Sequence, residues 1–220
     1  KRQTVDGRVV PVVSQYGKLG RLVRQGIPQS AIAQWTYDTL RPGALTSVTS
    51  YTDGNAYTQR VDAYDHAGRP TSATVVIPSA EGALAGSYTT KTTYTQAGQT
   101  RTISYPKAGD LPAETVTYTY NTQGMPTTLA GAQTYVKAAS WSPHGALSQT
   151  IHNQTSSIAQ TFYRDPETLR VNEQQLSNTG AYSNVDKTLY TYDQVGKITQ
   201  TYSCLLYKSP SPRDRTRYRI

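Results

Sequence analysis

The sequence predicts an all-β protein built as a ribbon of consecutive antiparallel β-hairpins. Three observations lead to this fold class: one short motif recurs along the chain, alternating Thr and aromatic residues precede its copies, and a second extended stretch follows them. A chain that repeats itself in this way is an array of one supersecondary unit, so the structure of that unit determines the fold.

The recurring motif is Tyr-Asp-x-x-Gly-[Arg/Lys], present in about seven copies. It is complete at Tyr64–Arg69 and Tyr192–Lys197, whereas the other copies keep the aromatic residue with or without the Asp or the Gly. Copies begin 21 residues apart at the closest (Tyr120 to Trp141) and 30 at the most (Tyr64 to Tyr94), so loops of variable length must separate them. The repeat signature comprises Tyr37, Asp38, Tyr64, Asp65, Gly68, Arg69, Tyr94, Gly98, Tyr120, Gly124, Trp141, Gly145, Tyr163, Tyr192, Asp193, Gly196 and Lys197.

Each copy of the motif lies between two stretches that favour strands. Residues 115–120 and 188–192 alternate Thr with aromatic or aliphatic residues, and period-two alternation is typical of a strand with two differently solvated faces. Extended stretches follow the Gly, as in residues 70–77 and 198–202. Strand, motif and strand together predict a hairpin.

The chemistry of the motif indicates a turn. An Asp can accept hydrogen bonds from backbone N–H groups just ahead of it, and Gly adopts positive φ. No second carboxylate or His recurs with Asp65 and Asp193 at metal-ligand spacing. We therefore interpret both Asp residues as structural, in preference to catalytic or metal-binding.

The remaining segments predict loops and a thin sheet. Residues 79–87 and 106–112 contain Gly, Pro and small residues and are expected to be loops, with at most a helical turn over 81–85. The hydrophobic residues, 36% of the chain, are spread through the strands, so we expect a modest core. Exposed strand edges at both ends are an aggregation hazard.

The sequence offers no catalytic constellation. His66 and His144 fall in predicted turns and His152 in a strand-like stretch, and no nucleophile elbow, zinc-binding helix motif or Gly-rich phosphate loop occurs. We expect no catalytic activity, no cofactor and no metal.

Residues 204–220 break the pattern. The segment Cys204–Asp214 resembles the translation of a transposon-based sequencing adapter, from which only Lys208 differs, and an Arg-rich end follows. We expect residues 1–203 to form the repeat array, truncated at both ends, and 204–220 to be a non-native or disordered basic tail; a natural basic tail is the alternative.

Charge and cysteine content limit the partners. The tail holds five of the 22 basic residues and one of the 14 acidic residues, so it supplies half of the net charge of +8. The rest of the chain has no basic stripe that calls for nucleic acid. The single Cys, Cys204, excludes a disulfide framework within residues 1–203. No apolar run is long enough for a membrane span.

The repeated motif resembles the RHS or YD repeat of bacterial RHS and wall-associated proteins, toxin-complex shells and animal teneurins. The segments Trp35–Leu40, Ile77–Gly86 and Leu111–Tyr118 are particularly similar to actinobacterial members of the polymorphic-toxin shell type. The resemblance covers residues 5 to 203. It implies a curved, open fragment of a hollow β-shell.

The resemblance also implies a role. Such shells enclose or present a C-terminal toxin, so the expected function is a non-catalytic structural segment of a secreted or cell-wall-associated bacterial protein. The expected partners are the rest of the RHS shell and the toxin domain. No effector domain is recognisable in the sequence itself.

The alternative function is a cell-wall or carbohydrate-binding repeat module. Trp35, Trp141 and the many Tyr residues have faces on which sugar rings stack, and cell-surface glycans are the corresponding partners. Cross-strand aromatic pairs that hold a sheet together explain the same residues, and their place at the repeat anchors favours this structural role. An enzyme remains a third and less favoured interpretation.

Overall fold

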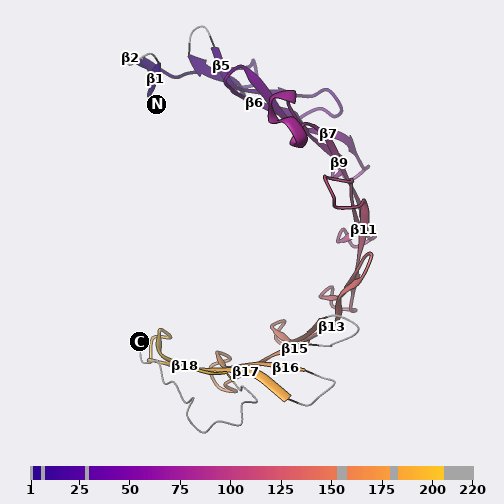
Figure 1. The fold of residues 1–220 in the computed structure, drawn as a ribbon, viewed down its shortest axis with the longest axis vertical. Helices are drawn as coiled ribbons and strands as arrows, with labels where there is room; N and C mark the ends of the chain where they lie inside the picture. Colours follow the sequence, from indigo (N-terminus) through magenta and orange to yellow (C-terminus); the bar gives the residue numbers. More distant parts are fainter. Residues whose placement is uncertain (1, 6–7, 28–29, 153–157, 179–182, 206–220) are drawn as a thin grey trace. The chain divides into compact units, whose positions relative to one another are not determined.

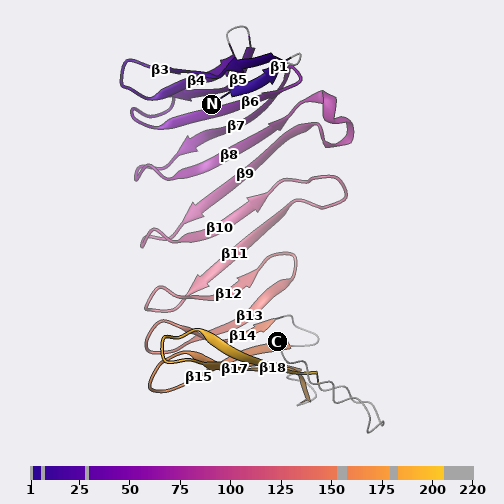
Figure 2. The ribbon, with the colours of Figure 1, turned by 90° about the vertical axis from the view of Figure 1, so that its left-hand side faces the viewer.

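The computed structural model describes residues 2–5, 8–27, 30–152, 158–178 and 183–205. It is all-β, with one short 3₁₀ helix, η1, at Ser79–Leu84. Sixteen strands, β3 to β18, pair in chain order as one open antiparallel sheet, and β1 and β2 form a separate two-stranded sheet (Figures 1 and 2). The predicted ribbon of consecutive hairpins is confirmed.

The strands are short to medium in length, and η1 falls where the sequence allowed a helical turn. The strands are β1 Arg2–Val5, β2 Arg8–Pro11, β3 Val13–Tyr16, β4 Leu22–Ile27, β5 Ser30–Tyr37, β6 Leu45–Thr52, β7 Asn55–Tyr64, β8 Pro70–Ile77, β9 Gly86–Tyr94, β10 Thr100–Tyr105, β11 Glu114–Tyr120, β12 Pro126–Ala130, β13 Thr134–Trp141, β14 Leu147–His152, β15 Ile158–Arg164, β16 Val171–Asn178, β17 Ser183–Tyr192 and β18 Ile198–Leu205.

The chain divides into two compact units, residues 1–115 and 116–220. Inside each unit a strand pairs with its neighbours in the sequence, so successive hairpins alternate their turns between the two ends of the strands, as Figure 2 shows for β5 to β10. One set of turns holds the signature motif. The other set varies: β6 and β7 join through Asp53 and Gly54, whose φ angles of 48° and 78° suit a two-residue hairpin turn.

The sheet has almost no buried interior, as expected. Among the residues whose burial the structure describes, only Gly26, Thr74, Val116 and Ala159 are buried. Pairs of Thr hydroxyls link neighbouring strands, at 2.9 Å between Thr49 and Thr58 and at 2.6 Å between Thr93 and Thr102. Cross-strand pairs therefore supply much of the stabilisation that a core supplies in a globular domain.

Strand β18 extends two residues past the boundary predicted after residue 203. Strand β18 continues through Cys204 and Leu205, which pair with Lys187 and Asp186 of β17. The reason is that a ten-residue β17 offers backbone partners irrespective of the side chains that follow Ser203. The rest of the predicted tail, 206–220, lies outside the described residues. In the part of the chain that is described, no helix has the length and apolarity of a membrane span.

Thr74 is the most buried polar side chain described, at 2% exposure. Its hydroxyl donates to the carboxylate of Asp62 and, having a single proton, accepts from the hydroxyl of Thr89 at 2.7 Å. The Thr74 hydroxyl, together with the guanidinium of Arg60, lowers the pKa of Asp62 from its ordinary value. Three neighbouring strands are thus joined by one buried hydroxyl.

Replacing Thr74 by Val keeps the shape and removes the hydroxyl. We expect Thr74→Val to lower the free energy of unfolding by about 1–3 kcal/mol, because Asp62 and Thr89 lose a partner. Since the folded-state pKa of Asp62 is depressed, its contribution is present above the unfolded value of about 3.9 and is lost as pH falls through the folded value. The variant should therefore lose less stability between pH 6 and pH 3 than the wild type does. Urea titrations at both pH values measure this, and equal pH dependence in the two proteins would contradict it.

Candidate functional site: the signature turns

The complete motif at Tyr64 folds as a tight turn between β7 and β8. The N–H of Asp65 donates to the carbonyl of Arg69 at 2.9 Å, and the N–H of Gly68 donates to the carbonyl of Asp65 at 3.0 Å. The Asp65 side chain accepts from the N–H of Arg69 at 2.8 Å, and Gly68 has φ of 82°. The Asp and the Gly therefore have the turn functions that the sequence indicated.

The incomplete copies keep the same hydrogen bonds with other side chains. The residue after the aromatic is Thr95, Asn121 or Ser142, and each is a side-chain acceptor. Thr95 accepts from the N–H of Gln99 at 3.2 Å, Asn121 from that of Met125 at 2.9 Å and Ser142 from that of Ala146 at 3.2 Å. What recurs at this position is an oxygen that accepts a turn N–H, whether or not it carries charge.

We call the residue that ends the strand before each signature turn the anchor. The polar atoms of five anchors donate to a backbone carbonyl of the preceding hairpin. These donors and acceptors are Tyr37 to Leu22 (3.0 Å), Tyr64 to Leu45 (2.7 Å), Tyr94 to Pro70 (2.7 Å), Trp141 to Pro126 (2.8 Å) and Tyr192 to Val171 (2.7 Å). In the first three, the acceptor is the residue paired with the preceding anchor: Leu22 with Tyr16, Leu45 with Tyr37 and Pro70 with Tyr64. The anchors thus connect one hairpin to the next.

In three repeats, the basic residue that follows the turn also contacts the next hairpin. The guanidinium of Arg21 lies 4.5 Å from the ring centre of Tyr37, that of Arg69 lies 4.3 Å from Tyr94, and that of Arg170 lies 5.7 Å from Tyr192. These distances are within the range of cation–π attraction. These three signature turns are therefore tied to the following anchor by a cation–π contact as well as by hydrogen bonding.

The turn Gly makes room for this basic side chain. A methyl group on Gly196 would lie 2.7 Å from Nη2 of Arg170, and one on Gly98 would lie 3.1 Å from Nη1 of Arg69. Gly196 also has φ of 88°, a conformation that L residues rarely adopt. A Gly is required at Gly196 for two reasons: the backbone has positive φ, and the Arg170 side chain of the preceding repeat occupies the space of a methyl group.

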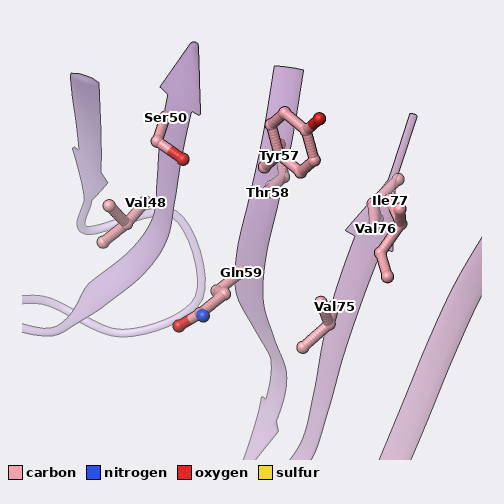
Figure 3. A pocket seen from close by; sticks show the side chains of 8 residues that line it. All are labelled: Val48, Ser50, Tyr57, Thr58, Gln59, Val75, Val76 and Ile77. Atoms are coloured by element: carbon pink, nitrogen blue, oxygen red, sulfur yellow. The ribbon is translucent and has the colours of Figure 1, made fainter. Parts of the chain in front are cut away.

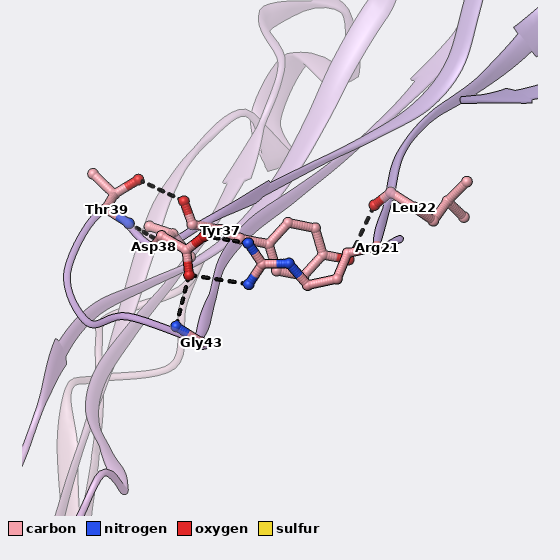
Figure 4. A network of polar contacts seen from close by, with 7 residues as sticks. Arg21, Leu22, Tyr37, Asp38, Thr39 and Gly43 are labelled. Atoms are coloured by element: carbon pink, nitrogen blue, oxygen red, sulfur yellow. Dashed lines mark hydrogen bonds and ion pairs between the residues drawn. The ribbon is translucent and has the colours of Figure 1, made fainter. Parts of the chain in front are cut away.

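The pair of Arg21 and Asp38 shows the contacts of one junction (Figure 4). Both guanidinium Nη atoms of Arg21 donate to the carboxylate of Asp38, and the N–H of Gly43 donates to the same carboxylate at 2.6 Å. Arg21 and then Gly43 lower the pKa of Asp38 from its ordinary value. Backbone donation from Arg69 lowers the pKa of Asp65, and that from Thr168 lowers the pKa of Asp165. Carboxylates held ionised in this way suit turn acceptors better than proton-transfer groups.

The turn after Tyr37 contains a turn Gly, Gly43, although the sequence has none at the motif spacing. Asp38 donates through its N–H to the carbonyl of Ala44 at 2.9 Å, so this turn is two residues longer than the one from Asp65 to Arg69. Gly43, with φ of 83°, precedes Ala44 just as Gly68 precedes Arg69. Because the turn has two additional residues, Gly43 does not stand at the fixed spacing by which the motif was recognised.

The anchor predicted at Tyr163 is wrong by one residue. Arg164 pairs with Val171 at the strand end, and its Nη2 donates to the carbonyl of Leu147 at 3.3 Å, as the aromatic anchors donate to theirs. Tyr163 is 47% exposed. Asp165 is the turn acceptor, and Leu169, with φ of 57°, stands where other turns have Gly. The prediction chose Tyr163 because it is aromatic and stands next to Arg164, which occupies the anchor position.

One signature turn was missed in the sequence. Tyr16 ends β3, and Gly20 and Arg21 follow it at the motif spacing, with Gly17 in the Asp position. The N–H of Gly17 donates to the carbonyl of Arg21 at 2.8 Å, and that of Gly20 donates to the carbonyl of Gly17 at 2.9 Å. The signal that could have identified this copy is the aromatic residue with a Gly four positions later.

The histidines do not come together at a site. His66 and His144 are exposed in separate signature turns, and His152 contacts the Tyr135 carbonyl and the Thr150 hydroxyl. In the described part of the chain, no group of three or more His, Cys, Asp or Glu residues is placed to hold a metal ion.

A hollow of about 330 Å³ lies on β6, β7 and β8 (Figure 3). Its lining is Val48, Ser50, Tyr57, Thr58, Gln59, Val75, Val76 and Ile77. The hydroxyl of Tyr57 donates to Glu81 of η1, which raises the pKa of Tyr57. The lining has no charged residue, so the hollow offers a weakly polar surface without the convergent groups of a catalytic site.

No protein-family model matches the chain, and no curated protein matches it. Solved structures of toxin complexes share its fold. A crystal structure of TcdB2-TccC3-Cdc42 aligns with a TM-score of 0.61 at 16% identity, over 88% of this chain and 11% of that chain. TcdB2-TccC3 without the hypervariable C-terminal region and the Photorhabdus luminescens Tc holotoxin pore each align with a TM-score of 0.60 at 16% identity, over 87% of this chain and 11% of theirs. The likeness establishes a common fold, and this chain spans about 11% of the length of those chains.

Substitutions at two turn glycines distinguish the energetic cost of positive φ from the cost of disturbing the contact between repeats. We expect Gly20→Ala to cost about 1–2 kcal/mol because φ is positive while a methyl group there meets nothing within 4 Å. Gly196→Ala should cost about 0.5–1 kcal/mol more, since the methyl group displaces Arg170 from Tyr192. Chemical denaturation measures both. Equal costs would show that Arg170 adds nothing to the junction.

Restoring an aromatic anchor at residue 164 should stabilise the protein. Nε of Arg164 is buried without a hydrogen-bond partner among the described residues. We expect Arg164→Tyr to raise the free energy of unfolding by about 0.5–2 kcal/mol, because it removes this unpaired group and supplies a hydroxyl for the Leu147 carbonyl. The matched control is Tyr163→Phe, which should change stability by less than about 0.5 kcal/mol. A lower melting temperature for Arg164→Tyr would contradict the assignment of the anchor.

Proposed function

We propose that this chain is a non-catalytic structural segment of a secreted RHS-repeat protein, part of a β-shell that encloses or presents a C-terminal toxin. The observation that carries the proposal is the use of the signature residues. Anchors donate to the backbone of the preceding hairpin, turn acceptors bind the backbone of their own turn, and three Arg residues lie over the ring of the next anchor. Together these residues hold neighbouring hairpins of the sheet in contact.

Two further observations support this role. The sequence resembles RHS repeats, a family that includes toxin-complex shells, and solved structures that share the fold include toxin complexes. The sheet is also a single layer with few buried side chains, so each hairpin depends on its neighbours in the sheet. A wall that separates two aqueous spaces has these properties.

Secretion is part of the proposal. Cys204 is the only Cys, so residues 1–203 contain no thiol that changes state between a reducing cytoplasm and an oxidising exterior. The partners we propose are the remaining shell and the toxin domain of the complete protein.

Carbohydrate binding at the repeat aromatics is less well supported. The hydroxyls of Tyr37, Tyr64, Tyr94 and Tyr192 already donate to backbone carbonyls, and three of these four rings have an Arg over them. A sugar would have to displace those contacts. The hollow beside Tyr57 is another candidate surface for a glycan.

Protease protection in the protein encoded by the uninterrupted gene tests the shell role. We expect a C-terminal domain that resists a protease in the wild type and is cleaved when Tyr64→Ala and Tyr94→Ala together weaken the wall. Tyr163→Ala is the matched control, because Tyr163 is exposed and is not an anchor. A C-terminal domain cleaved equally fast in all three proteins, or a gene that encodes none, would contradict the proposal.

A further inference from the structure

The chain has one methionine, Met125, and it lies at a junction between repeats. Met125 directly follows the turn Gly of its repeat, as Arg69 does in its own. A methyl group on Gly145 of the next turn would lie 3.1 Å from Cε of Met125, and one on Gly98 would lie 3.1 Å from Nη1 of Arg69. Met125 therefore packs beside the next turn in the position that an Arg occupies elsewhere.

Met125 also adjoins the hydrogen bonds of this junction. Its N–H donates to the side chain of Asn121 at 2.9 Å, and its carbonyl accepts from the N–H of Asn121 at 2.9 Å. The next residue, Pro126, accepts a hydrogen bond from the indole N–H of the anchor Trp141 at 2.8 Å. A chemical change in the Met125 side chain therefore occurs next to both the turn and the anchor contact.

The Met125 side chain is within reach of small solutes. Met125 is half-buried, and Gln123 and Pro126, close to it on either side in the sequence, are exposed. A thioether in such a position reacts with dissolved oxidants while the chain is folded. The guanidinium groups of Arg21, Arg69 and Arg170 at the other junctions are inert to peroxides, so the junction at Met125 differs from those three in its chemistry.

We propose that Met125 is an oxidation site through which peroxides weaken the contact between two repeats. Hydrogen peroxide transfers one oxygen atom to the thioether sulfur, its O–O bond breaks and water leaves. The sulfur loses two electrons, which reduce the peroxide, and the product is methionine sulfoxide. The S=O group is polar and requires hydrogen-bond partners, which it finds in water and not in the apolar contact with Gly145. The oxidised side chain therefore moves away from the next turn.

Polarity by itself is compatible with this position, since Arg69 and Arg170 occupy it in their repeats. Their guanidinium groups lie 4.3 Å and 5.7 Å from the ring centres of the next anchors, and cation–π attraction holds them there. A sulfoxide is neutral and gains no such attraction. Oxidation of Met125 therefore removes an apolar contact and supplies nothing in its place.

Hydrogen exchange of the full chain before and after peroxide treatment tests the proposal. The background is Cys204→Ser, because Cys204 is exposed and is the other sulfur-containing residue. We expect peroxide to oxidise Met125 in the folded protein, and exchange at residues 142–146, the turn beside Met125, to become about fivefold faster. Residues 193–197, whose junction has Arg170, should change by less than about twofold. Reductases for both sulfoxide epimers should restore the original exchange.

Two variants of Met125 make the test specific. Met125→Leu keeps an apolar side chain, so exchange at 142–146 should stay close to that of the parent and should not respond to peroxide. Met125→Gln has a polar, neutral side chain, so it should reproduce the faster exchange without any oxidant.

Three results would overturn the proposal. One is a Met125 that peroxide oxidises only when the chain is unfolded, and another is sulfoxide formation with unchanged exchange at 142–146. The third is an equal response of Met125→Leu to peroxide, because the effect would then come from another residue. None of these results bears on protease protection of the complete protein, so the shell role is tested separately.

Discussion

The hydrogen bond from each anchor to the preceding hairpin is the interaction on which this structure depends. A single-layer sheet has no opposing layer against which to bury side chains, and only three side chains are buried among those whose burial is described. Within one hairpin the turn sets the register of the two strands. The anchor adds a specific contact between successive hairpins, because its donor reaches one particular carbonyl, as Tyr64 reaches that of Leu45.

The other recurring residues support this contact. The acceptor after the anchor closes the turn, the Gly permits positive φ and leaves space, and the basic residue lies over the next ring, as Arg69 lies over Tyr94. Each contribution is small, on the order of 1 kcal/mol or less. Their repetition along the chain makes stability a sum of junctions, in which a weak junction such as that at Arg164 is tolerated because its neighbours are complete.

The sequence predicted the local parts of this arrangement and missed those that depend on register. Alternating Thr and aromatic residues identified the strands, and Asp65 and Gly68 identified the turn, because both signals lie within a few residues. Arg164 was missed because an Arg can reach the same carbonyl as a Tyr, and Gly43 because an insertion moved it. Tyr16 was predictable, since Gly20 and Arg21 follow it at the usual spacing. The contact of Arg69 with Tyr94 follows from stacking between hairpins, which no short motif encodes.

A double-mutant cycle between Arg69 and Tyr94 tests most directly whether the signature residues join neighbouring hairpins. Arg69→Ala, Tyr94→Ala and the double variant are compared by chemical denaturation with the wild type, which isolates the energy that couples the two side chains. The account predicts a favourable coupling of about 0.5–1 kcal/mol, appropriate for a partly exposed cation over a ring 4.3 Å away. Additive effects of the two substitutions would show that each residue serves its own turn alone, and would contradict it.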